Sequence, residues 1–273
     1  MLDRTTAYGL DFVFPRGDQV VGASLRRHGE FARVELDFLV EMAGGAGALI
    51  DVGANIGAIA LPFARAKPDW KVICIEAHRG LHGVLAANAL LNGLHNTEVH
   101  HAAAGPVRGI VEFPTLSLEE KANFGTLGFS ANTGRTEAVR MLTLDEIAPE
   151  DTALIKIDVE GFETEVLKGA ARLLQARKAI WLAEATIQHP KTAAEVIATL
   201  LGNGYRVYWF YAPFVTPQSE KDTPTNAGVG DANVVALPPG VENVWGLTEV
   251  SGPDDRRPPN IQAYPYLARY GYS

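Results

Sequence analysis

The chain has 273 residues, of which 47% are apolar and 21% are charged, proportions that are ordinary for a soluble globular protein. Its net charge is −8 at pH 7 and it contains no run rich in lysine or arginine, which argues against a nucleic-acid-binding protein. A chain of this length buries roughly three quarters of its unfolded surface, so it can form one large domain with embellishments.

The sequence also carries little that would direct the chain to a membrane. The first six residues lack the charged-then-apolar layout of a signal peptide, and no apolar run reaches the ~20 residues of a membrane span. Cys74 is the single cysteine and lies within an apolar strand pattern, so we interpret it as a buried apolar residue in a reducing compartment. We therefore expect a cytoplasmic protein.

Residues 1–45 are expected to form an N-terminal segment that packs on the core. Short strands and turns are predicted over residues 1–26. A helix should follow and end at Gly44-Gly45, because apolar residues recur at helical spacing at Phe31, Val34, Phe38, Leu39 and Met42.

Strands and helices then alternate through residues 46–240. The expected strands are Ala48–Val52, Trp70–Glu76, Glu98–Ala103, Ala153–Val159 and Ala179–Glu184, with two shorter ones at Ile110–Phe113 and Val139–Leu144. Helices are expected over Gly57–Arg65, from Phe162 to about Ala176 and from about Lys191 to Leu201. A further helix, after the second strand, should have Leu81, Val84, Leu85, Leu90 and Leu91 on its inward face. Tyr205–Tyr211 and Asn233–Leu237 should form an antiparallel hairpin at the sheet edge. This alternation predicts an α/β fold: a doubly wound, mostly parallel seven-stranded sheet with an antiparallel edge strand.

Residues 241–273 form a tail of unknown role. Four tyrosines lie among its prolines, at positions 264, 266, 270 and 272. Packing on the domain, a dimer arm and part of a lid all stay open.

The first strand of the alternating region ends in a glycine-containing turn, Asp51-Val-Gly-Ala-Asn-Ile-Gly57. Closely spaced glycines such as Gly53 and Gly57 let the backbone approach a nucleotide-like ligand. A dinucleotide fingerprint needs a second glycine where this turn has Asn55. Asp51 would repel a pyrophosphate but suits an ammonium group. The turn therefore predicts an adenosine joined to an amino acid, which describes S-adenosylmethionine.

Ligands of an open parallel sheet bind outside the carboxyl ends of its strands. Glu76 ends the second strand about twenty residues after the turn, the spacing of an acid that binds ribose hydroxyls. Ala103 is small enough to admit an adenine ring beside the third strand, although simple packing explains it equally well.

Three residues at the ends of the fourth and fifth strands are candidates for catalysis. Asp158 should face the methyl-donor pocket and, with Glu184 or His189, could orient a hydroxyl and take its proton. Glu160 and Glu163 suit the positive end of the following helix. The carboxylates could instead hold a divalent cation, but the sequence shows no tight metal-ligand spacing, so we expect no metal. Five further histidines are interpreted as surface or helix-cap residues, namely His78, His82, His95, His100 and His101.

Taken together, these segments resemble the FkbM-type methyltransferases. The resemblance rests on the glycine turn, Glu76-Ala77, the Leu85…Asn88…Asn92 helix, Thr143-Leu144-Asp145, and the segment from Lys156-Ile-Asp-Val-Glu-Gly161 to Val166-Leu-Lys-Gly-Ala170. It implies a Rossmann-like class I methyltransferase fold and S-adenosylmethionine-dependent O-methylation, often of sugar or natural-product hydroxyls.

The resemblance also implies roles for individual residues. Gly53 and Asn55 would lie beside the methionine part of the cofactor, Glu76 would hold the ribose, and Asp158 would sit at the methyl-transfer centre. Asn123-Phe124-Gly125 would belong to a loop that closes over the cofactor or substrate.

We therefore expect a methyltransferase (EC 2.1.1) that acts on a hydroxyl of a small molecule or glycan, with no nucleic-acid partner; a homodimer stays open. A nicotinamide-dependent oxidoreductase is disfavoured by Asn55 and Asp51. A non-catalytic adenosine-binding module is the third interpretation, and the acids at the fourth and fifth strand ends argue against it.

Overall fold

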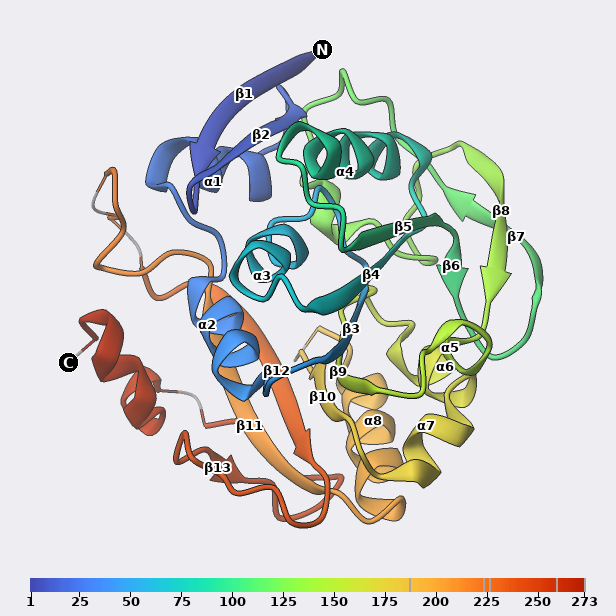
Figure 1. Cartoon of the computed structure of the whole chain (residues 1–273), viewed down its shortest axis with the longest axis vertical. Helices are drawn as coiled ribbons and strands as arrows, with labels where there is room; N and C mark the ends of the chain where they lie inside the picture. The colour runs from blue at the N-terminus through green and yellow to red at the C-terminus, as the bar shows by residue number, and fades with distance from the viewer. Residues whose placement is uncertain (187, 223, 226, 259, 273) are drawn as a thin grey trace.

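The computed structural model describes residues 1–186, 188–222, 224–225, 227–258 and 260–272. This part of the chain is built around an eight-stranded sheet in the order β13-β11-β12-β10-β9-β3-β4-β5 (Figure 1). The five consecutive strands from β10 to β5 run parallel: β10 (Ile180–Glu184), β9 (Thr152–Ile157), β3 (Gly47–Val52), β4 (Trp70–Glu76) and β5 (Thr97–His101). All of β3 is buried, as expected for a central parallel strand covered on both faces. The predicted α/β, mostly parallel fold is confirmed.

Two details of the predicted sheet are wrong. The antiparallel strand β12 (Gly230–Leu237) is not at the edge, because it lies between β10 and β11 (Arg206–Pro213) and pairs with both. A further two-residue strand, β13 (Thr248–Glu249), pairs with β11 and makes the eighth strand. The hairpin pairing of β11 with β12 is as predicted. Residues 232–237 of β12 are all buried, as expected for a strand in the interior of a sheet that is covered on both faces.

The predicted third strand is also shorter than expected. β5 ends at His101, and Ala103–Ala104 forms β6 in a separate sheet of the described residues, with the order β6-β8-β7. Its other strands are β7 (Gly109–Pro114) and β8 (Thr136–Leu142), which correspond to the two shorter strands of the prediction.

Helices cover both faces of the main sheet (Figure 1). On one face, α2 (Arg33–Met42) contacts α3 (Ala60–Ala66), and α4 (Arg79–Leu91) packs on β5. On the other, α6 (Glu163–Lys168) contacts both α7 (Ala171–Ala176) and α8 (Pro190–Gly202). A short helix, α5 (Leu144–Ile147), precedes β9.

Three helical features differ from the prediction. The helix expected from Phe162 to Ala176 is split into α6 and α7 at Gly169, where a Cβ would lie 2.1 Å from the carbonyl oxygen of Gly105. Residues 21–28 form helix α1 (Val21–His28). No side chain caps its N-terminus, so the sequence does not indicate where this helix begins. Leu90 and Leu91 are exposed.

Asn88 occupies the buried face of α4 that those leucines were expected to share. Its Nδ2 donates to the carbonyls of Val13 and Ile56 (3.0 Å each), and its Oδ1 accepts from the Val13 N–H (2.8 Å). It thereby ties the N-terminal hairpin of β1 (Leu2–Ala7) and β2 (Leu10–Pro15) to the turn that follows β3. Cys74 is buried in β4, as predicted.

The C-terminal tail packs on the domain. Tyr264, Tyr266 and Tyr270 are buried, the last two in η3 (Pro265–Tyr270). The hydroxyl of Tyr266 accepts from the Tyr211 N–H (2.7 Å) and donates to the Tyr211 carbonyl (3.0 Å). The division of the chain into N-terminal segment, core and tail stays a prediction. In the described part of the chain, no helix has both the length and the apolar character needed to cross a membrane.

Candidate active site

The turn after β3 is packed against the loop that follows β9. Gly53 has a φ of +82°, and a Cβ at this position would lie 1.9 Å from the carbonyl oxygen of Asp158. Asn55 also has a positive φ, +52°, a conformation that asparagine tolerates better than most residues, and its Oδ1 accepts from the Ile56 N–H (2.8 Å). The sequence of this turn therefore brings the ends of two adjacent strands together.

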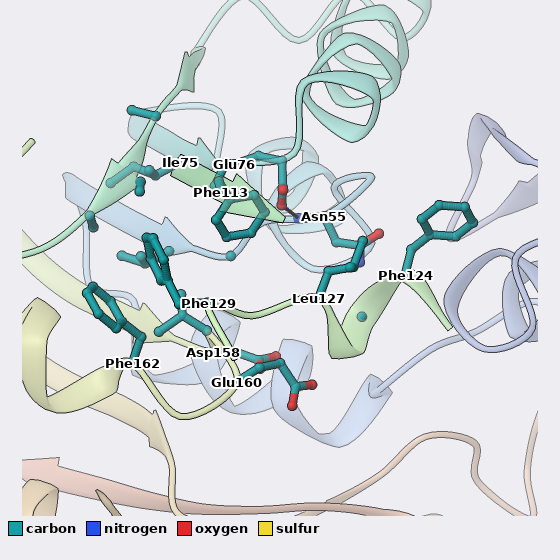
Figure 2. Close-up of a pocket in the computed structure, with 18 residues that line it drawn as sticks. Asn55, Ile75, Glu76, Phe113, Phe124, Leu127, Phe129, Asp158, Glu160 and Phe162 are labelled. Atoms are coloured by element: carbon teal, nitrogen blue, oxygen red, sulfur yellow. Dashed lines mark hydrogen bonds between the residues drawn. The ribbon is translucent and has the colours of Figure 1, made fainter. Parts of the chain in front are cut away.

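Glu76 is fixed at the end of β4 by two backbone donors. The N–H of Asn55 donates to Oε2 (Figure 2) and the N–H of His78 donates to Oε1, both at 2.8 Å. Burial raises the pKa of this carboxyl to about 7, although these hydrogen bonds act in the opposite direction. The carboxylate is therefore held in one orientation and retains lone pairs for further donors.

A cavity, here called the first lobe, opens beside Glu76. Apolar and aromatic side chains form most of its walls, including Ile75, Ala103, Phe113, Leu127, Phe129 and Phe162. The ring of Phe129 lies 5.2 Å from that of Phe113 and 4.2 Å from that of Phe162, between centroids. Figure 2 shows Glu76 on one side of the cavity and Asp158 with Glu160 on the opposite side. The first lobe can accept a flat apolar ring with polar groups at its ends.

A second lobe adjoins the first and shares Gly53, Asn55, Gly125, Asp158 and Glu160 with it. At its base, the buried Lys156 Nζ lies 3.2 Å from Asp158 Oδ2, 3.4 Å from Asp51 Oδ1 and 3.9 Å from Glu35 Oε1. Burial alone would lower the pKa of Lys156, but these carboxylates raise it well above its usual range. Lys156 is therefore a permanent positive charge at this position.

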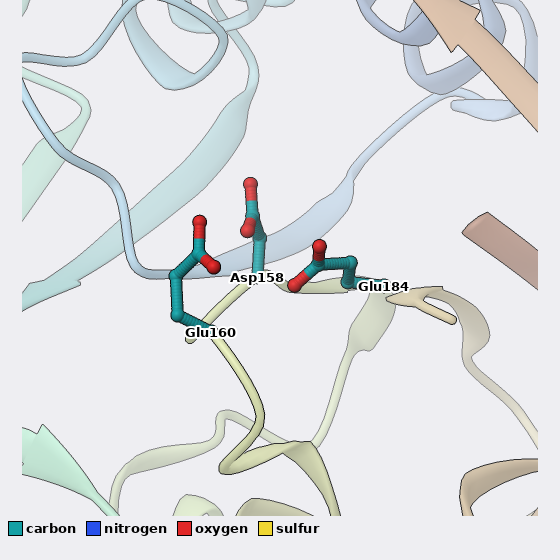
Figure 3. Close-up of side chains that lie close together, drawn as sticks. All are labelled: Asp158, Glu160 and Glu184. Carbon is teal, nitrogen blue, oxygen red and sulfur yellow. The ribbon is translucent and has the colours of Figure 1, made fainter. Parts of the chain in front are cut away.

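Acids crowd the junction of the two lobes. Asp158, Glu160 and Glu184 each place one carboxylate oxygen within 4.8 Å of the others (Figure 3). Burial, followed by the charges of Asp158 and Glu160, raises the pKa of Glu184 to about 10. Similar causes raise the pKa of Glu160 to about 8. Carboxylates this close do not all ionise without a compensating charge.

The structure brings most of the predicted site residues together. Asp51 lines the second lobe, Gly53, Asn55 and Asp158 line both, and Glu76 and Ala103 line the first. Glu184 joins them through its contact with the other acids. The predicted loop at Asn123-Phe124-Gly125 borders both lobes as well.

Two predicted residues lie apart from the lobes. A Cβ on Gly57 would lie 2.6 Å from side-chain atoms of Leu61 and Leu85, so this glycine permits the close packing of α3 and α4. His189 does not line either lobe; it lies at the N-terminus of α8, next to Gly161, in a surface pocket that shares Phe129, Glu160 and Phe162 with the first lobe.

Comparison with known proteins gives the family. The sequence matches the methyltransferase FkbM domain over residues 51–207. The chain belongs to the FkbM methyltransferase family. It is therefore a methyltransferase (EC 2.1.1), and the family implies the use of S-adenosylmethionine. Neither the oxidoreductase nor the non-catalytic module is supported. No curated protein matches the chain.

The chain is similar to solved structures of several methyltransferases, at low identity and with TM-scores below 0.5. Methyltransferase FkbM from Methylobacillus flagellatus is 19% identical with a TM-score of 0.45, and the match covers 72% of this chain and 45% of that one. Precorrin-6y C5,15-methyltransferase from Geobacter metallireducens is 14% identical with a TM-score of 0.47, covering 76% and 87%. A putative O-methyltransferase from Klebsiella pneumoniae is 14% identical with a TM-score of 0.46, covering 85% and 84%.

The FkbM-family site contains four charged residues that the sequence analysis did not assign to it, namely Glu35, Lys156, Glu160 and Asp231. The sequence allows Lys156 to be assigned to the site, because residues two apart on a strand share a face and Asp158 follows Lys156 by two. Asp231 is the second residue of the antiparallel strand β12, whose start lies at the carboxyl edge of the parallel strands. Glu35 comes from α2, and no local sequence pattern indicates that it lies in the site.

Glu160 and Glu163 have different roles although both lie near the start of α6. Glu163 Oε1 accepts from the N–H groups of Val159 and Gly161 (3.1 Å each), so it stabilises the loop as expected for an acid at a helix start. Glu160 instead points into the junction of the lobes (Figure 3). His78 caps α4 by accepting from the Leu81 N–H (3.2 Å), as predicted for a helix-cap histidine.

Proposed function

We propose that this FkbM-family protein transfers a methyl group from S-adenosylmethionine to a hydroxyl of a sugar, glycan or natural product, with Asp158 as the residue that takes the hydroxyl proton. The position of Asp158 carries the proposal, because its carboxylate lies where the two lobes meet. A donor in the first lobe and an acceptor in the second would both reach it.

The residues present fit the donor. Glu76, oriented by two backbone N–H groups, would accept hydrogen bonds from the ribose hydroxyls. Ala103 and Phe129 would flank the adenine ring. Asp51 Oδ1 is buried and has no hydrogen-bond partner among the described residues, although Lys156 lies 3.4 Å away, and it suits the ammonium group of the methionine part.

S-adenosylmethionine supplies a methyl group bonded to a positively charged sulfur. Asp158 would orient the acceptor hydroxyl behind this group and accept its proton, since a neutral hydroxyl is a poor nucleophile. Lys156, 3.2 Å from Asp158 Oδ2, would hold the carboxylate in place. Glu184 would assist from the same cluster, whereas His189 lies farther from the lobes and would have to reach past Gly161.

The test is the Asp158→Asn variant, with Asp151→Asn, an exposed acid on the opposite side of β9, as the matched control. Labelled methyl transfer is measured against a panel of sugars and glycosylated metabolites, and S-adenosylhomocysteine binding is measured by calorimetry. We expect Asp158→Asn to reduce turnover by about 10²–10⁴-fold and to change binding little. Unchanged turnover, or transfer by the wild type to nitrogen but never to a hydroxyl, would contradict the proposal.

A further inference from the structure

Among the described residues, acids outnumber basic side chains around the second lobe and its junction with the first. Six carboxylates lie there, from Glu35, Asp51, Asp158, Glu160, Glu184 and Asp231. The one lysine of the cluster, Lys156, contacts Asp158, Asp51 and Glu35. Within the described parts of the chain, Glu160, Glu184 and Asp231 have no ion pair. A buried carboxylate without a partner is costly, so this arrangement calls for a further cation.

Glu184 is the residue that points most clearly to such a cation. Its side chain is 7% exposed, yet its Oε2 atom has no hydrogen-bond partner in the described structure. Figure 3 shows its carboxylate directed toward Asp158, and Glu160 completes the group from the other side. A buried oxygen aimed into a cluster of acids lacks a donor and is free to act as a metal ligand.

The spacing of the three acids also fits a metal ion. One oxygen of each lies within 4.8 Å of the others. Three oxygens spaced evenly around one Ca²⁺ ion are about 4.0–4.5 Å apart, and around Mg²⁺ about 3.5–3.6 Å apart, given their usual bond lengths. The group can therefore hold Ca²⁺ after a small contraction, and Mg²⁺ or Mn²⁺ after a larger one.

We propose that Asp158, Glu160 and Glu184 bind one hard divalent cation. This revises the expectation of no metal, which rested on the absence of tight ligand spacing along the sequence. The inference rests on the proposed function, because Asp158 and Glu160 also line the second lobe, where the cation would hold the oxygen of the acceptor hydroxyl. One carboxylate oxygen of Asp158 would then bind the cation, and the other would still take the proton of the acceptor hydroxyl.

The first experiment measures Mn²⁺ binding to the full chain by electron paramagnetic resonance, after treatment with EDTA and without donor or acceptor. We expect one site, from which Mg²⁺ or Ca²⁺ displaces Mn²⁺. Glu184→Gln and Glu160→Gln should each weaken binding at least tenfold. Glu165→Gln, the same change on the exposed side of α6, should leave it unaltered.

Thermal unfolding shows whether these variants are folded. Wild-type protein should gain Tm on addition of Mn²⁺, since a ligand that binds only the native state stabilises it. Glu184→Gln should lose this gain, and without metal its Tm should be no lower than that of the wild type, because Gln is similar in size to Glu and leaves no charge to bury. No Mn²⁺ binding at millimolar concentration, or equal binding by wild type and Glu184→Gln, would overturn the inference.

The two proposals can fail separately. If EDTA-treated protein methylates a hydroxyl at an unchanged rate, the cation inference is wrong and the proposed function stands. If Mn²⁺ binds as expected but no hydroxyl in the panel is methylated, the cation site stands and the proposed function is wrong.

Discussion

The affinity for the methyl donor should depend on pH through Glu76. Its carboxylate must be ionised to accept hydrogen bonds from both ribose hydroxyls, and burial raises its pKa to about 7 before the ligand binds. Because the folded pKa is raised, the protonated form dominates below pH 7 and the binding form dominates above it. For a single group with that pKa, the dissociation constant at pH 6 is about tenfold higher than at pH 8.

Calorimetric titration with S-adenosylhomocysteine between pH 6 and pH 8 measures this dependence without turnover. Glu76→Gln should bind about 10- to 200-fold more weakly at pH 8, since a hydrogen bond to a charged group contributes about 1.5–3 kcal/mol. It should also lose the pH dependence. Glu119→Gln, an exposed acid, is the matched control. A wild-type affinity that is flat over this range, or an equal slope in Glu76→Gln, would refute the reasoning.

Two further substitutions test how the turn is supported. Asn88→Ala removes three buried hydrogen bonds and should lower the free energy of unfolding by about 2–4 kcal/mol in urea titrations; a loss under about 1 kcal/mol would show that the link to β2 matters little. Gly53→Ala places a Cβ 1.9 Å from the Asp158 carbonyl and should weaken S-adenosylhomocysteine binding at least tenfold. Gly83→Ala, where nothing lies within 4 Å of the added Cβ, should bind normally, and equal binding by both variants would contradict the role of Gly53.

The central part of the fold follows from local patterns. Largely apolar runs such as Ala48–Val52 predict buried parallel strands, and the glycine turn with Glu76 predicts the donor side of the site. The order of the last strands does not follow, because the sequence of β12 shows that it is buried but not which strands flank it. The break at Gly169 depends on the approach of Gly105, which is 64 residues earlier in the chain and has no local signal.

The acidic part of the site was only half predictable. Asp158 and Glu184 were found because strand ends in a parallel sheet meet at one edge. The sequence predicts for both Glu160 and Glu163 an acid that suits a helix dipole, and this describes Glu163 but not Glu160. Two acids in the same helix start look alike in sequence, and only the three-dimensional path of the loop separates them. Because Glu160 resembles Glu163 in sequence, the cluster of Asp158, Glu160 and Glu184 on which the metal inference rests could not be predicted.

A crystal structure with S-adenosylhomocysteine tests the account most directly. We predict the ribose hydroxyls on the carboxylate of Glu76, the adenine beside Ala103 in the first lobe, and the sulfur next to Asp158 where the lobes meet. A ligand bound elsewhere, or one in the first lobe whose ribose does not contact Glu76 and whose sulfur points away from Asp158, would contradict it.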